Sequence, residues 1–83
     1  MSLDDLKTAG AKVVGVKQTA KALQKKTASG VYIAADAEER IMAPIKAECE
    51  KQNVDCLVVE SMQVLGKACG IHGGASAAAI LKN

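Results

Sequence analysis

The sequence has almost no aromatic residues: Tyr32 is the sole one among 83, with no Phe and no Trp. Protein modules that bind single-stranded RNA or DNA, such as RNA-recognition motifs and OB-folds, stack bases on aromatic side chains. One tyrosine inside an apolar segment cannot provide such a surface, which excludes those classes. The core must consist instead of Val, Ile, Leu, Met and Ala.

Long apolar runs are also absent. No segment approaches the roughly 20 residues that a membrane-spanning helix needs. The chain begins MSLDD, which is acidic and lacks the apolar stretch of a secretory signal. We therefore expect a cytoplasmic protein without a membrane partner. Because 49% of the residues are apolar, a packed core is available, and the length suits one domain over residues 1–83.

The sequence contains few cysteines, and they are not closely spaced in pairs. Cys49, Cys56 and Cys69 are odd in number and form no CxxC pair, so we expect no disulfide framework. Cys69 and His72 have CxxH spacing, but zinc sites usually need two such close pairs. We expect no metal and no other cofactor, and we interpret Cys49 and Cys56 as small core residues.

The signatures of catalysis are incomplete. Gly66-Lys67 resembles the end of a phosphate-binding loop, but Ser61 stands where the first glycine belongs. Ala68 stands where Ser or Thr would bind Mg²⁺. The Cys69–His72 pair has neither an orienting third group nor an identifiable oxyanion hole. We therefore expect no enzymatic activity.

Two kinds of segment alternate along the chain. Runs of β-branched or small residues predict strands at 12–16, 31–35, 54–59 and 77–81. Helical spacing of apolar residues predicts helices at 3–9, 17–26, 37–42, 44–52 and 62–69. This alternation predicts an α/β fold with a central sheet and helices on both faces.

Four local features refine this prediction. Proline inside a helix costs about 3 kcal/mol, so Pro44 is expected to divide the third helical region. Asp36 and Glu39 have the spacing of a capping box. The all-apolar run at residues 57–59 predicts a central strand buried on both faces. Ser61 and Asn53 are expected to begin and end their neighbouring helices.

The clearest binding signal is a strand–glycine–helix junction at Gly15. Free N–H groups at a helix start can receive phosphate oxygens, and Lys17 and Lys21 add positive charge one turn apart. Gln18 offers both a donor and an acceptor to a base edge. On spacing alone, a solvated basic helix face is the more ordinary interpretation.

Two segments together change that balance. GVKQTAKAL (15–23) and VESMQVLGKACGI (59–71) resemble the kink-turn-binding ribosomal protein family, large-subunit protein seven-Ae, and especially its small bacterial YbxF-like members. The first family motif is Gly-x-Asn-Glu-x-x-Lys, with Lys17 and Gln18 here at the Asn and Glu positions, a pattern that indicates the bacterial branch. The second motif, Leu-Gly-x-Ala-x-Gly-Ile, is matched by Leu65, Gly66, Ala68, Gly70 and Ile71.

The resemblance implies a three-layer α-β-α sandwich around a four-stranded mixed sheet. It also implies binding to kink-turn RNA, in which tandem sheared G·A pairs bend the helix. Gln18 would contact the sheared guanines, the lysines would contact phosphates, and a second loop would pack on a flipped-out nucleotide. The implied RNA-binding residues are Gly15, Lys17, Gln18, Lys21, Val59, Glu60, Ser61 and Met62.

We therefore expect a non-enzymatic RNA-binding protein that recognises and stabilises kink-turn RNA, ribosomal or ribosome-associated, with ribosomal RNA or a riboswitch as candidate targets. The alternative is a protein–protein adaptor of a ribonucleoprotein with little or no RNA binding. No coiled-coil seam is present, so we expect a monomer.

Overall fold

The computed structural model describes residues 1–82, which form four helices and a four-stranded mixed sheet. The elements are α1 (Leu3–Thr8), β1 (Lys12–Val14), α2 (Val16–Gln24), β2 (Ala28–Ala34), α3 (Glu39–Gln52), β3 (Asp55–Val59), α4 (Met62–Ala68) and β4 (Ala77–Leu81). The predicted fold class is confirmed. β1 is shorter than predicted, because Val16 already belongs to α2.

The strands lie in the order β1-β4-β2-β3, with β4 antiparallel to both neighbours and β2 parallel to β3. β3 is thus an edge strand, and the side chain of Val58 is 50% exposed. The prediction that residues 57–59 form a central strand is wrong. The central positions belong to β2 and to β4, whose residues Ala77, Ala78 and Ala79 are fully buried.

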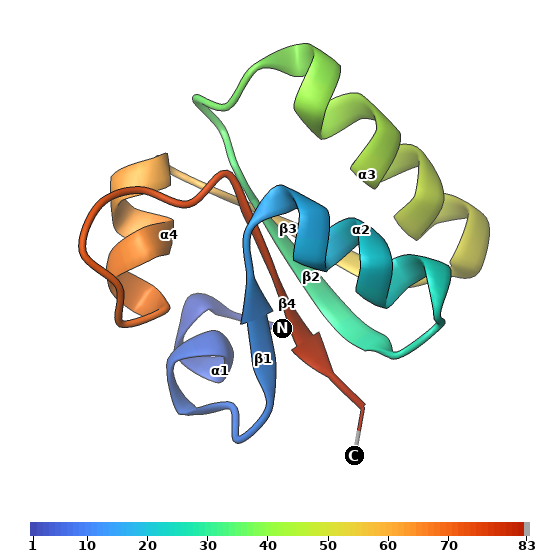
Figure 1. The fold of residues 1–83 in the computed structure, drawn as a ribbon, viewed down its shortest axis with the longest axis horizontal. Coiled ribbons are helices and arrows are strands. Elements are labelled where there is room, and N and C mark those ends of the chain that lie inside the picture. The colour runs from blue at the N-terminus through green and yellow to red at the C-terminus, as the bar shows by residue number, and fades with distance from the viewer. Residues whose placement is uncertain (83) are drawn as a thin grey trace.

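Helices cover both faces of the sheet (Figure 1). α2 and α3 lie side by side on one face, and α1 and α4 cover the other. α2 buries Thr19, Ala22 and Leu23, whereas Ala20, which the apolar spacing also places inward, is exposed. Among the described residues, no helix is long and apolar enough to cross a membrane.

α3 runs without interruption, so the predicted break at Pro44 is wrong. Pro44 lies on the exposed side of the helix and cannot donate to the carbonyl of Arg40, four residues earlier. Arg40 is exposed too, so water can hydrogen-bond that carbonyl. The opposite side of α3 buries Met42, Ile45 and Cys49. Packing of this apolar side outweighs the loss of one helical hydrogen bond.

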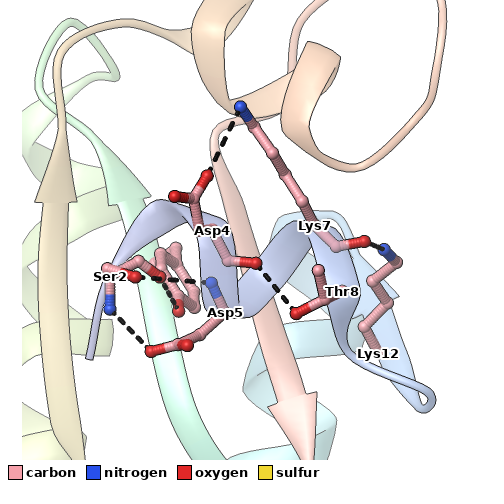
Figure 2. A network of polar contacts seen from close by, with 7 residues as sticks. Ser2, Asp4, Asp5, Lys7, Thr8 and Lys12 are labelled. Carbon is pink, nitrogen blue, oxygen red and sulfur yellow. Dashed lines mark hydrogen bonds and ion pairs between the residues drawn. The ribbon is translucent and has the colours of Figure 1, made fainter.

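α1 is only six residues long and is fixed at both ends by polar contacts (Figure 2). Ser2 and Asp5 form a capping box, with Ser2 N–H donating to Asp5 Oδ2 at 2.9 Å. Lys12 Nζ donates to the carbonyls of Leu6 and Lys7 in the last turn, and Figure 2 shows the contact with Lys7. The buried Tyr32 donates its hydroxyl to the carbonyl of Ser2. The chain's one aromatic side chain therefore anchors α1 and is not available to stack on a base.

Candidate nucleic-acid interface

The connections that carry the predicted binding residues meet at one end of the sheet. β1, β2 and β3 run parallel to one another, because β4 is antiparallel to β1 and β2. Their C-terminal ends therefore lie beside the start of β4, at the top of Figure 1. We call this end the loop edge. It consists of Gly15, residues 35–38 and 60–61, and Ala75 and Ser76 at the end of the connection that leads into β4.

Gly15 joins β1 directly to α2. Its N–H donates to the carbonyl of Ala77 at 2.8 Å, and its carbonyl accepts from Thr19 N–H at 2.9 Å. Its φ of 113° lies in a region that L side chains rarely adopt. A Cβ at this position would lie 2.6 Å from Oε1 of Gln18, so the glutamine amide folds back over the junction. The backbone conformation requires glycine here, whereas the amide of Gln18 is the end of a flexible side chain and can move aside.

The start of α2 has the features of an anion site. Gly15 provides no side-chain cap, and the first turn contains no acidic residue. The first N–H groups of the helix have no partner within it, and they carry the positive end of the helix dipole. Lys17 and Gln18 are both exposed beside them. Phosphate oxygens are the ligands that such a helix start favours.

Two of the predicted residues also share a hollow farther along α2. This hollow of about 330 Å³, which we call the α2 hollow, has Gln18, Lys21 and Lys25 among its lining residues. The apolar part of the lining includes Val13 of β1 and Leu81 of β4. Lys17 does not line it. A side chain suited to a base edge thus lies beside two cations suited to phosphates.

The second predicted segment, residues 59–62, is less exposed than the first. Val59 is 5% exposed, and its carbonyl accepts from Ala35 N–H at 2.7 Å. Ser61 Oγ accepts from Val64 N–H at 3.1 Å and caps α4, as predicted. Met62 is half-buried, whereas Glu60 is exposed. Most of this segment is therefore buried or half-buried, and its hydrogen bonds hold the loop edge in place.

Residues 75–77 connect the two predicted segments. Ala75 N–H donates to the carbonyl of Met62 at 3.0 Å, and Ser76 Oγ donates to the sulfur of Met62 at 3.4 Å. The next residue, Ala77, accepts the hydrogen bond from Gly15 N–H through its carbonyl. Segments more than 40 positions apart in the sequence are thus joined through a third one.

Asp36 is a residue of this edge that sequence reasoning misassigned. It was predicted to cap the third helix, but that helix begins after Glu38 and has no side-chain cap. Asp36 Oδ1 instead accepts from Met62 N–H at 2.7 Å. The partner is 26 residues away in the sequence, so no local pattern could have revealed the contact.

The connection between α4 and β4 adds an exposed surface that the sequence reasoning interpreted only as a turn. Residues 70–74 are all exposed, and Ile71 presents 40% of its apolar surface to solvent. Figure 1 shows this connection running alongside α4 and ending at the start of β4. Its neighbour Ala75 is bonded to Met62, so it borders the predicted site. The sequence motif that contains Gly66 and Gly70 also includes Ile71, and it was the signal that could have indicated this exposed surface.

The cysteines do not add a reactive centre to this edge. Burial, followed by the neighbouring Cys56 and Glu48, raises the pKa of Cys49 to about 12. Burial also raises the pKa of Cys69. Both thiols stay protonated at neutral pH and are poor nucleophiles. His72, which was predicted to face solvent, is exposed.

Comparison with known proteins places this geometry in context. The pattern of the ribosomal protein L7Ae/L30e/S12e/Gadd45 family matches residues 2–83. "RNA-binding protein YbxF" of Geobacillus stearothermophilus is 43% identical over 82 residues, 99% of this chain and 100% of that protein. An "RNA-binding protein" of Bacillus pumilus is 42% identical over 98% of this chain and 99% of its own. The Giardia lamblia 15.5kD RNA binding protein has a TM-score of 0.84 at 27% identity, over 98% of this chain and 68% of that one.

Proposed function

This chain belongs to the ribosomal protein L7Ae/L30e/S12e/Gadd45 family, and from that premise we propose that it is a non-enzymatic protein that recognises and stabilises kink-turn RNA. Its target has tandem sheared G·A pairs, and the protein acts as a monomeric ribosomal or ribosome-associated factor in the cytoplasm. Relatives named as RNA-binding proteins match it over nearly its whole length, which supports an RNA partner.

One observation carries this proposal: the uncapped start of α2, Gln18 and Lys21 lie together at one corner of the fold. Gln18 is assigned to the guanine edges of the sheared pairs, because its amide both donates and accepts. Lys17 and Lys21 are assigned to phosphates. Ile71 offers an exposed apolar surface against which an unstacked nucleotide can pack.

Residues 59–62 keep a place in the proposed site, mainly as its support. Glu60 is exposed and negative, so it sets the border beyond which the RNA backbone does not extend. Met62 holds the loop edge together through Asp36 and Ala75. Binding then folds the RNA by population shift, since the protein prefers the kinked state to the extended one.

The proposal is tested by titrating the protein against a kink-turn duplex and against a copy in which the G·A pairs are replaced by Watson–Crick pairs. We expect clear preference for the kink-turn. Equal affinity for both RNAs would remove the specific-binding claim. Negligible binding to either at physiological salt would instead favour the adaptor function.

A matched pair of variants tests the role of Gln18. Gln18→Ala should lose about 1–3 kcal/mol of discrimination between the two RNAs, as expected for a lost base contact. Gln24→Ala removes the same side chain from the flank of α2 that faces α3, and it should bind like the wild type. If Gln18→Ala also binds like the wild type, Gln18 does not read a base. Lys25→Ala should mainly make the salt dependence shallower, by up to about one unit of slope.

A further inference from the structure

Charge is divided unevenly over this fold. No acidic residue lies between Asp5 and Asp36 or after Glu60, and both stretches contain lysines. Apart from Asp4 and Asp5 on α1, the acidic residues lie on α3, on β3 and in the connections beside them. The side of the molecule formed by β1, α2 and β4 is therefore basic. A polyanion is attracted to that side.

A group of lysines lies at the end of α2 that is opposite the loop edge. Lys26, Lys51 and Lys82 line a hollow of about 380 Å³, and we call them the lysine cluster. They come from the turn after α2, the last turn of α3 and the residue after β4. The one acidic residue of the lining is Glu48, whose Oε2 already accepts from Gln52 Nε2 at 2.6 Å.

Backbone hydrogen bonds hold two of these lysines in place. Lys26 has a left-handed φ of 59° directly after α2, and its N–H donates to the carbonyl of Leu23 at 3.0 Å. Thr27 N–H donates to the carbonyl of Ala22 at 2.9 Å and closes the same turn. Lys82 N–H then donates to the carbonyl of Thr27 at 2.7 Å. The chain's last strand is thus fastened beside the end of α2.

Residues of the lysine cluster are adjacent in sequence to residues of the α2 hollow. That hollow includes Lys25, Thr27 and Leu81 in its lining, and the cluster contains the adjacent residues Lys26 and Lys82. A helix rises 1.5 Å per residue, so Gln18 lies about 9 Å from Gln24 at the end of α2 and roughly 12 Å from Lys26. An RNA duplex is A-form and rises somewhat less than the about 3.4 Å per base pair of DNA, so the distance from Gln18 to Lys26 corresponds to roughly four base pairs.

We propose that the lysine cluster binds phosphates of an RNA stem that continues past α2 from the kink-turn, an inference that rests on the proposed function. The contact is independent of base sequence, because a lysine ammonium acts as a point charge and lacks the planar fork that reads guanine. The preferred target is therefore a kink-turn with a stem of at least about four base pairs on the α2 side.

The test uses kink-turn RNAs that differ in the length of one stem at a time, which is either about ten or about three base pairs. Each short stem is closed by a tight hairpin loop. The variant K26Q/K82Q removes two charges from the lysine cluster. The variant K46Q/K67Q removes two exposed charges from α3 and α4 and is the matched control. K26R/K82R restores the charge. Affinities are measured over a series of salt concentrations, after circular dichroism has compared the folds.

We expect K26Q/K82Q to bind the long-stem RNA about tenfold more weakly than the wild type, with a salt slope shallower by about two units. On the RNA whose stem on the α2 side is short, this variant should bind with the same affinity as the wild type. K46Q/K67Q should match the wild type on every RNA, and K26R/K82R should bind like the wild type.

Two results overturn the inference: a loss by K26Q/K82Q no larger than that of K46Q/K67Q, or an equal loss on long and short stems. If these lysines only complement the helix dipole, the variant melts at a lower temperature with unchanged RNA affinity. The proposed function fails separately, when the wild type shows no preference for G·A pairs but still shows the stem-length effect. Absence of binding to all of these RNAs removes both proposals.

Discussion

Gly66 lies inside α4, where the connection between α4 and β4 packs directly against it. Glycine-to-alanine changes in an exposed helix interior normally stabilise a protein by about 1 kcal/mol. Here a Cβ would lie 2.2 Å from the carbonyl oxygen of Gly73 and 3.1 Å from Cα of Gly74. Both are backbone atoms, so the connection itself must move. We expect Gly66→Ala to destabilise the fold by about 1–3 kcal/mol, the range for overpacked sites.

Urea and thermal unfolding measure this change. A loss of about 2 kcal/mol should lower Tm by roughly 8–16 °C in a chain of this size. Gly10→Ala is the matched control, because a Cβ there meets no atom within 4 Å, and it should be neutral or slightly stabilising. Unchanged or increased stability of Gly66→Ala would show that the connection does not depend on this close approach. RNA affinity should also fall, since displacement of the connection alters the loop edge.

Two further predictions concern α3. Pro44→Ala restores an N–H to the carbonyl of Arg40 and should stabilise the fold by about 1–2 kcal/mol, less than the full proline penalty because the unfolded chain gains entropy; a lower urea midpoint would contradict this. Burial keeps the Cys49 thiol protonated in the folded state from its ordinary pKa of 9.0 up to about 12. The unfolded thiol ionises in that window, so the unfolding free energy of the wild type should fall relative to Cys49→Ala as the pH rises from 9 to 12, by up to about 1.4 kcal/mol per pH unit, with no such trend below pH 9. Parallel pH profiles for the two proteins would refute this assignment.

Sequence patterns failed where long-range contacts outweigh local preferences. The break expected at Pro44 is absent because buried side chains hold α3 together despite the proline. Asp36 has the spacing of a helix cap, but its carboxylate instead bonds Met62 across the loop edge. Each local rule was reasonable, and in each case a partner distant in the sequence decided the outcome.

The sequence alone determined the alternation of helices and strands, the junction at Gly15 and the motif pair that indicates the family, because all three depend on local spacing. The order of the strands depended on tertiary structure. The apolar run at residues 57–59 lies at an edge, and the alanines of β4 lie at the centre. An apolar run shows neither how many neighbours a strand has nor that both of its faces are covered, since Val58 in this run is exposed. Only the folded chain brings Lys26 beside Lys82, since their proximity depends on strand pairing and not on distance along the sequence.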